Sequence, residues 1–522
     1  MTEGQMFAIK TRVACFLFAV TVLLMSAFTA SAQKKHENFV PNEVLVKLKP
    51  GKSRASKNDF ASRMHTSVAE ELGDSRWIRI KLSPGQTVDD AIKTFGRSVD
   101  VESVQPNYYY QLQSVPNDPR WSDLYGMVKI SAPAAWDLFT GDSTVVVADI
   151  DTGFDYTHED LAGNAWTNTG EIPGNGVDDD GNGFVDDYYG YDFRFNDPDP
   201  MDENAHGTHT AGTIGAIGNN LMGVSGVAWH VKIMGIKIYN EFGDDTTSAM
   251  VINAYNYVRM MKNRGVNIRV TNNSYGGCPE TCGNDPAVKE GIDALGDAGI
   301  LNVFAAGNAG VNTDVTPFFP ASYDSPSIVS VGGSDQNDHR VFNFGATTVD
   351  LAAPGSIILS TVPEALQQAK YWNLSGTSMS APHVSGAAAL LAMYNPSLSA
   401  ASLKATLINS VDVLPQFNGL NKANGRLNVE RALLNQSVCT FNLASNSILV
   451  PTKGGTFSVN VAGGNNCDFA ARSTVKWLKV IGSGSYSGNS TVTFRVTVNP
   501  TISRSANLMI AGQTFNVQQS RQ

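Results

Sequence analysis

Short apolar runs alternate with longer segments of helical character between residues 132 and 332. The runs are rich in Val and Ile, which favour strands, and each run is too short for an ordinary helix. Strands that alternate with helices are typical of a parallel sheet covered by helices on both faces, so we expect an α/β domain. The expected strands are 144–150, 231–239, 268–272, 301–305 and 328–332, and the expected helices are 209–217, 246–263 and 286–298.

Two regions of different character flank this domain. Upstream, the pattern predicts a small α+β unit, with strands at 43–47, 77–80 and 101–104 and helices at 53–72 and 88–95. Downstream, short strands separated by Gly and Asn turns predict a small β-sandwich, with strands at 447–450, 456–461, 475–480 and 491–498. The expected boundaries are 33–113, 114–436 and 437–522.

The first 32 residues have the pattern of an export signal. Lys10 and Arg12 precede an apolar run over 13–30, which ends in Ala30-Ser31-Ala32. We therefore expect a signal peptide over 1–32 and a secreted protein, whether extracellular, periplasmic or associated with the cell surface. An uncleaved membrane anchor is the alternative, because the run is close to the roughly 18 residues that a span requires.

Four of the five cysteines lie beyond the signal. In an exported chain an even number of cysteines favours disulfides, and neighbours in sequence suggest Cys278 with Cys282 and Cys439 with Cys467. Four cysteines allow three pairings. A metal site is the alternative, although neither pair has clustered histidines at zinc spacing.

The net charge of −10 is distributed unevenly. Residues 114–436 contain 36 acidic and 16 basic residues, whereas residues 437–522 contain 7 basic residues and 1 acidic residue. An acidic surface repels phosphate backbones, so we expect no nucleic-acid partner. Carboxylates do suit divalent cations.

Three polar motifs occur where strands end or helices begin. Asp151 follows the expected strand 144–150, His206 precedes a helix of small residues, and Ser378 precedes an apolar helix over 384–393. A serine attacks at neutral pH only with a base in hydrogen-bond reach, and that base needs an orienting acid. Negative charge on the attacked carbonyl needs donors, which the Asn308 amide and the helix N-terminus at Ser378 can supply. The chain order Asp, His, Ser is one in which this constellation occurs.

Residues 114 to about 435 resemble the catalytic domain of the subtilase family of serine peptidases, in particular its thermitase-like branch. The resemblance rests on four motifs in family order and spacing: Asp151-Thr152-Gly153, His206-Gly207-Thr208-His209, Ala306-Gly307-Asn308 and Gly376-Thr377-Ser378-Met379-Ser380-Ala381-Pro382-His383. It implies a subtilisin-like three-layer α/β fold and a secreted serine endopeptidase. In that reading Asp151 orients His206, His206 is general base and then acid, Ser378 attacks, and Asn308 binds the oxyanion. The competing hypothesis is a catalytically dead binding or adhesion protein that acts through its C-terminal domain.

A peptidase must hold protein or peptide substrates in an extended form, so the substrate should bind as an added strand. The resemblance places Ser274-Tyr275-Gly276 on one side of the cleft, Gly243 on the other, and Ala306 and Gly307 in the wall of the primary pocket. Tyr275 departs from the more usual Leu. The nearby Cys278–Cys282 loop either braces the cleft or narrows it.

Residues 36–113 resemble the inhibitory propeptide of the family, which implies a zymogen. The resemblance places Asn107 to Leu112 in the active site, and we expect self-cleavage between Tyr110 and Pro116. An unrelated adapter domain is the alternative.

Two calcium sites are expected, and no organic cofactor. Asp178, Asp180 and Asn182 place oxygen ligands in a loop like the start of an EF-hand. Its twelfth position is Tyr189 instead of Glu, so Asp186 or Asp187 must complete the shell. A solvated acidic loop is the alternative. The resemblance implies a second site at Asp118, Asp160 and Asn219.

Residues 437–522 resemble a BACON-type domain through Cys439, Gly454-Gly455, Cys467, Trp477, Arg504 and the segment 515–519. This implies a glycan or cell-surface ligand, and the alternative is a plain stabilising or export appendage. We expect a monomer.

Overall fold

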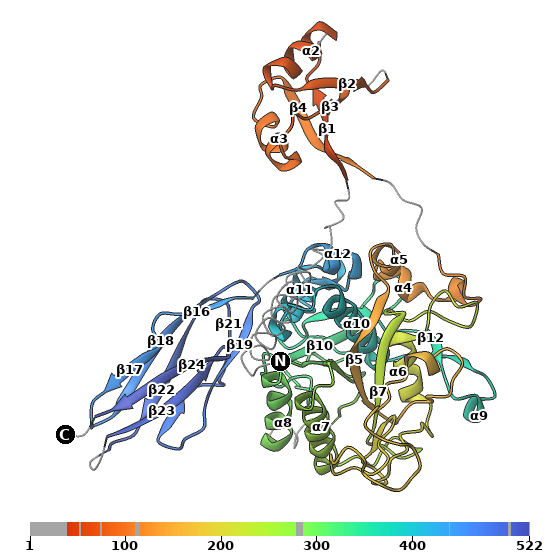
Figure 1. The fold of residues 1–522 in the computed structure, drawn as a ribbon, viewed down its shortest axis with the longest axis vertical. Coiled ribbons are helices and arrows are strands. Elements are labelled where there is room, and N and C mark those ends of the chain that lie inside the picture. The colour runs from red at the N-terminus through yellow and green to blue at the C-terminus, as the bar shows by residue number, and fades with distance from the viewer. Residues whose placement is uncertain are drawn as a thin grey trace, which may run out of the picture. The chain divides into compact units, whose positions relative to one another are not determined.

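The structure, a computed structural model, describes residues 39–51, 54–73, 76–109, 115–277, 285–437, 439–499 and 503–520. The chain forms two compact units, residues 1–112 and 113–522 (Figure 1). The expected signal peptide lies outside the described residues. Within the described part of the chain, no helix has both the length and the hydropathy to cross a bilayer.

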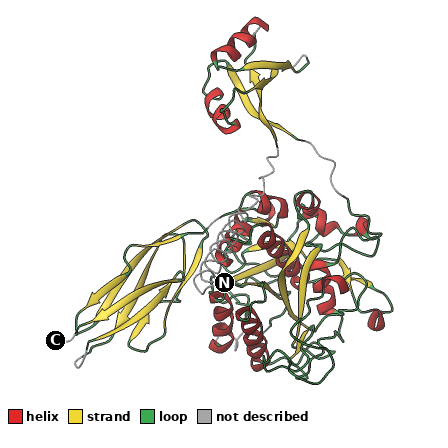
Figure 2. Ribbon diagram, in the orientation of Figure 1, coloured by secondary structure: helices red, strands yellow, loops and turns green. Residues whose placement is uncertain are grey.

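The N-terminal unit is an antiparallel sheet with two helices, as its α+β pattern predicts (Figure 2). Its strands lie in the order β2-β3-β1-β4. The expected helix over 53–72 is wrong in its second half, because His65 adopts a left-handed φ of 53° and the next residues pair with β3. The elements are β1 (Phe39–Leu48), α2 (Arg54–Arg63), β2 (Ser67–Glu71), β3 (Trp77–Lys81), α3 (Val88–Phe95) and β4 (Val101–Tyr108).

The second unit contains, within the described residues, a nine-stranded sheet in the order β14-β15-β11-β10-β9-β8-β5-β7-β6. Every pairing in it is parallel except β14 with β15, which confirms the α/β prediction. Its strands are β5 (Gly141–Asp151), β6 (Gly190–Asp192), β7 (His230–Lys237), β8 (Ile268–Asn273), β9 (Leu301–Ala305), β10 (Ile328–Ser334), β11 (Leu351–Pro354), β14 (Asp412–Val413) and β15 (Gly425–Arg426).

Helices cover both faces of this sheet (Figure 2). Along β5, Val145 and Val147 join the apolar cluster of α6 (His206–Gly215) and α10 (Thr377–Tyr394), because successive side chains of a strand point to opposite faces. Val146 and Ile150 join the cluster of α7 (Ser248–Asn263) and α8 (Pro286–Asp297). Helix α10 lies in the core, and 16 of its 18 residues are buried. The remaining elements are α4 (Tyr125–Lys129), α5 (Ala132–Trp136), β12 (Ile358–Thr361), α9 (Glu364–Gln367), β13 (Tyr371–Leu374), α11 (Ala400–Asn409) and α12 (Val429–Leu434).

The C-terminal region is all β and has two sheets, β16-β18-β22-β20 and β17-β24-β23-β19-β21, around one apolar core. The expected disulfide between Cys439 and Cys467 is present, whereas Cys278 and Cys282 lie outside the described residues. The strands are β16 (Phe441–Leu443), β17 (Ser447–Val450), β18 (Gly455–Gly463), β19 (Asp468–Ser473), β20 (Leu478–Val480), β21 (Ser485–Ser487), β22 (Ser490–Val496), β23 (Arg504–Ile510) and β24 (Gln513–Gln519).

Ion pairs attach this sandwich to the helical layer of the same unit. Lys404 of α11, buried in the contact, lies 2.9 Å from Asp468 of β19, and Arg472 lies 3.2 Å from Asp293 of α8. Burial lowers the pKa of Lys404, but the carboxylates of Asp350 and Asp468 outweigh it and raise that pKa overall. The sandwich is therefore a docked domain.

Candidate active site

The carboxylate of Asp151 and the imidazole of His206 meet between the end of β5 and the start of α6. Asp151 is buried, and its Oδ1 lies 2.7 Å from His206 Nδ1 and accepts a hydrogen bond from the Thr152 backbone. The two motifs approach so closely that a Cβ on Gly207 would lie 1.9 Å from the carbonyl oxygen of Gly153. Glycine at position 207 is therefore a geometric requirement of the pair.

The start of α6 is fixed by a second buried carboxylate, that of Asp202. It accepts hydrogen bonds from the backbone N–H groups of Asn204, Ala205 and Thr208, and from the hydroxyls of Thr152 and Thr208. These donors satisfy the N–H groups that a helix start leaves unpaired. Asp202 therefore holds His206 in place on the helix start.

The surroundings of His206 favour its protonated form. Burial of the ring opposes charge, but attraction to Asp151 and the hydrogen bond with it prevail and raise the pKa of His206 to about 9. An imidazole oriented and polarised by a carboxylate in this way is suited to accept a proton at Nε2.

Ser378 lies in the first turn of α10, as expected from its motif. Pro382, four residues later, has no N–H, so the carbonyl of Ser378 lacks its usual helical partner. The hydroxyl of Ser274 donates to that carbonyl instead (2.9 Å), and the Ser378 hydroxyl donates to the carbonyl of Ser274 (3.0 Å). Among the described residues, the Ser378 hydroxyl makes no hydrogen bond with His206. The structure thus pairs His206 with Asp151 and Ser378 with Ser274.

The side chain of Asn308 is oriented by Thr377. Its Oδ1 accepts hydrogen bonds from the backbone N–H (2.8 Å) and the hydroxyl (3.0 Å) of Thr377, which leaves the Nδ2 amide for other acceptors. The Thr377 hydroxyl is itself fixed, because it accepts the N–H of Gly307 at 2.9 Å. Thr377 was not among the predicted site residues. Its position next to Ser378 in the motif was the available signal.

Five of the six expected substrate-binding residues follow β8 or β9 at the carboxyl edge of the sheet, and Gly243 follows β7. Gly243, Tyr275 and Gly276 line a cavity of about 510 Å³. The Tyr275 hydroxyl lies 2.7 Å from that of Tyr255 and donates to Asn273 Oδ1, so its ring is held in the wall. Ser274, Ala306 and Gly307 lie nearer to Ser378 and Thr377. Sequence reasoning missed the other aromatic lining residues, Tyr239, Phe319 and Tyr323, because they come from distant loops.

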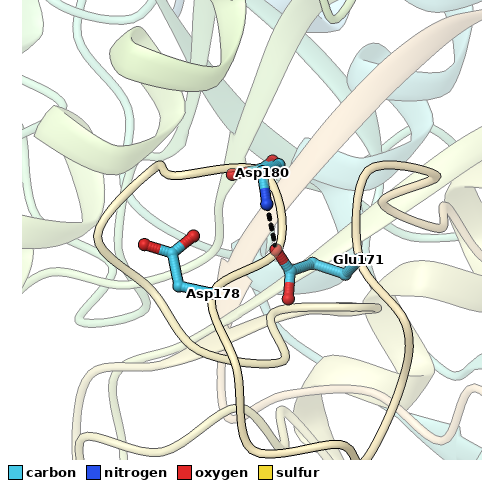
Figure 3. A group of neighbouring side chains, drawn as sticks. All are labelled: Glu171, Asp178 and Asp180. Atoms are coloured by element: carbon cyan, nitrogen blue, oxygen red, sulfur yellow. Dashed lines mark hydrogen bonds between the residues drawn. The ribbon is translucent and has the colours of Figure 1, made fainter.

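The acidic loop gathers carboxylates, and one of them was not predicted. Glu171, Asp178 and Asp180 offer oxygens that lie within 4.8 Å of one another (Figure 3). Glu171 Oε1 also accepts the N–H of Asp180 at 3.0 Å. Asn182 donates through Nδ2 to Asp187, and the carboxylate of Asp186 accepts the N–H groups of Asn175 and Gly176. Glu171 lies seven positions before the motif, which is why the spacing did not reveal it.

The other expected calcium residues also lie near one another. Asp118 accepts the backbone N–H groups of Asn219 (2.8 Å) and Asn220 (2.9 Å). The side chain of Asn220 donates to Asp160 Oδ1 at 2.8 Å. The structure therefore brings Asp118 and Asp160 to the loop at 219–220, which contains Asn219.

This chain is similar in sequence to known proteins. The Subtilase family profile matches residues 142–432, and the profile of the Fervidolysin N-terminal prodomain matches residues 26–107. Thermitase from Thermoactinomyces vulgaris is 36% identical over 61% of this chain and 99% of its own length. A thermophilic serine proteinase from Bacillus sp. (strain AK1) is 32% identical over 68% of this chain and 78% of its own length. The structure of a cold adapted subtilisin-like serine proteinase is 31% identical, covers 55% of this chain and 89% of its own, and has a TM-score of 0.43.

The family profile spans more than half of the chain, and thermitase is covered almost from end to end. The chain therefore belongs to the subtilase family: it is a serine endopeptidase with an N-terminal prodomain.

Proposed function

We propose that Asp151, His206 and Ser378 form one proton-transfer chain that hydrolyses peptide bonds through an acyl-enzyme. The observation that carries the proposal is the 2.7 Å contact of His206 Nδ1 with Asp151, which leaves Nε2 as the base. Rotation about the Cα–Cβ bond of Ser378 turns its hydroxyl from the Ser274 carbonyl toward that nitrogen. His206 then removes the proton as the oxygen attacks, and returns it to the leaving amine.

The developing oxyanion requires donors that already point at it. The Asn308 Nδ2 amide is one, because Thr377 holds the other end of the side chain. The N–H of Ser378 is a second, since it lies in the first turn of α10, where N–H groups have no helical acceptor. The extended substrate lies along Ser274-Tyr275-Gly276 on one side and near Gly243 on the other.

Covalent labelling with a fluorophosphonate probe tests this function. We expect the wild-type protein to be labelled and Ser378→Ala to remain unlabelled. Ser380→Ala is the matched control, because Ser380 lies in the same helix, is buried and has no hydrogen-bond partner among the described residues. Absence of label on the wild type would favour the inert binding or adhesion scaffold, and equal labelling of Ser378→Ala and wild type would show that the reactive nucleophile is another residue.

We also propose that the protein is a secreted zymogen that processes itself. The prodomain match and the Cys439–Cys467 disulfide, which needs an oxidising compartment, support this. The expected cleavage region between Tyr110 and Pro116 lies mostly outside the described residues. Normal processing of Ser378→Ala in the absence of other proteases would contradict intramolecular maturation. The glycan or cell-surface ligand and the monomeric state stay predictions.

Calcium is proposed as the structural cofactor of the acidic loop. Glu171, Asp178 and Asp180 are the residues that would hold it, since calcium is bound by carboxylate oxygens. We expect chelation to lower the thermal midpoint of the wild type and to have less effect on Glu171→Gln. Glu290→Gln, an exposed change on α8, should respond to chelation like the wild type. An unchanged midpoint of the wild type would contradict the proposal.

A further inference from the structure

A second aspartate lies behind Asp151 in the core. Asp149 of β5 is 2% exposed, and since strand side chains alternate, it faces the same side of the sheet as Asp151. Within the described part of the chain it forms no ion pair, and its contacts are neutral side chains of α6 and β8. An ionised carboxylate without a cation is very unfavourable in such a place.

The hydrogen bonds of Asp149 require a proton that the neighbours do not supply. Asn272 Nδ2 donates to Asp149 Oδ1 at 2.9 Å. Thr210 Oγ1 lies 2.9 Å from Asp149 Oδ2 and also 2.9 Å from the carbonyl oxygen of Gly207. A hydroxyl has one proton. If the Asp149 carboxylate and the Gly207 carbonyl were both acceptors only, one of the two contacts of Thr210 Oγ1 would be a pair of oxygens with no hydrogen between them.

We propose that Asp149 is a neutral carboxylic acid that positions the elements bearing the triad, an inference that rests on the catalytic roles proposed above. Its Oδ2–H donates to Thr210 Oγ1, and the Thr210 hydroxyl then donates to the carbonyl of Gly207. Its Oδ1 accepts from Asn272. Every polar atom in this set is then paired.

The charges around Asp149 agree with a neutral acid. Burial, and then repulsion from Asp151, raise the pKa of Asp149 well above its usual range. A protonated His206 lowers the pKa of Asp149, but the imidazole is already paired with Asp151. Lys237 of β7 is directed elsewhere, since its ammonium lies 2.8 Å from Glu203. Burial raises the pKa of Asp202 as well, and its five hydrogen bonds oppose that rise because they stabilise the ionised form.

Asp149 connects the strand of Asp151 to both other members of the triad. Through Thr210 it holds the first turn of α6, where His206 lies. Through Asn272 it reaches Ser274, whose hydroxyl donates to the Ser378 carbonyl, and Ser385 of α10 donates to Asn272 Oδ1. Because Asp149 is neutral, it does this without adding its own negative charge beside His206.

The test compares Asp149→Asn with Asp149→Val. Asn keeps both hydrogen bonds, because its Nδ2 donates to Thr210 and its Oδ1 accepts from Asn272. We expect kcat/KM of Asp149→Asn within about two-fold of wild type and the acid limb of its pH profile shifted by less than about 0.3 unit. Asp149→Val should lower kcat about ten-fold with KM within about two-fold, since substrate contacts remain.

An ionised Asp149 predicts a different profile for the same variant. Asp149→Asn would then remove a negative charge beside His206 and move the acid limb to lower pH by about one unit, which would overturn the proposal. Thr406→Val is the control, because Thr406 is a buried α11 residue whose hydroxyl forms hydrogen bonds with Ser402 and Ser437, outside this network. It should lower the thermal midpoint and leave kcat and the acid limb unchanged.

Infrared spectroscopy separates this inference from the proposed function. In the Ser378→Ala background, which needs no catalysis, the difference spectrum against Asp149→Asn/Ser378→Ala at neutral pH should show the carbonyl band of a protonated carboxylic acid. Absence of that band overturns the neutral Asp149 even if the enzyme is active. Failure of the fluorophosphonate probe to label wild type, with the band present, would refute the catalytic roles alone.

Discussion

The substitution Thr377→Val removes one hydroxyl and tests whether this buried residue orients the Asn308 amide that donates to the oxyanion. The hydroxyl supplies one of two hydrogen bonds on Asn308 Oδ1, at 3.0 Å, and the backbone N–H of Thr377 supplies the other, at 2.8 Å. Loss of an oxyanion donor lowers kcat by about 100-fold to 1,000-fold. Since one of the two anchors remains, we expect a loss of about ten-fold in kcat, or about 1.4 kcal/mol. KM should stay nearly constant, because the amide acts on the transition state.

The same substitution leaves the N–H of Gly307 unpaired, which should lower the free energy of unfolding by about 1–3 kcal/mol. Thr406→Val is the matched control. The buried hydroxyl of Thr406 likewise accepts one backbone N–H, from Ser437, and donates to one carbonyl, of Ser402. Both variants should lose similar stability in urea titrations, whereas only Thr377→Val should lose kcat on a chromogenic peptide. Equal kcat values for the two variants would refute the reasoning, and Thr377→Ser should restore most of the activity.

Three further results are expected. The base must be neutral to accept a proton, and the pKa of His206 is raised to about 9. We therefore expect kcat/KM to fall with decreasing pH, with the midpoint of this acid limb well above the ordinary histidine value of 6.5. A midpoint at or below 6.5 would be inconsistent with the pairing to Asp151. The double variant Cys439→Ser/Cys467→Ser opens a loop with a sequence separation of 28. It should lower the free energy of unfolding by about 3–4 kcal/mol in denaturant titrations and leave kcat unchanged. A decrease of less than about 1 kcal/mol would mean that other contacts constrain the loop. Lys404→Met leaves the buried Asp468 with the more distant Lys422 as its cation, and should lower the free energy of unfolding by about 3 kcal/mol. A single calorimetric transition at the wild-type temperature would show that the Lys404–Asp468 pair does not hold the sandwich in place.

The regular parts of the fold were predictable from local pattern. The Val and Ile runs of β5 and β8 and the helices between them were found because a buried parallel strand has a distinctive composition. The helix at His206 begins earlier than the expected 209–217, because the Asp202 carboxylate caps residues that precede the apolar pattern. The second half of the expected helix 53–72 failed because a single left-handed residue, His65, redirects the chain to pair with β3. Such long-range pairing leaves no periodic signal.

In the site, the motifs indicated which residues gather but not how they are held. Neither Thr377 nor Asp202 was predicted, since each acts through hydrogen bonds that exist only after distant segments meet. Glu171 joins Asp178 and Asp180 from outside the recognisable loop for the same reason. The hydroxyl of Thr210, which lies within hydrogen-bond distance of both Asp149 and the Gly207 carbonyl, is likewise invisible in sequence.

The central position of α10 also has a consequence for how the protein is made. Translation proceeds from the N-terminus at about 5–20 residues per second, and roughly 230 residues separate Asp151 from Ser378. Strands β5 to β11 therefore leave the ribosome before the helix that covers one of their faces. The part of that apolar face supplied by β5 therefore waits about 10–45 s for α10, and misassembly is most favoured in this interval.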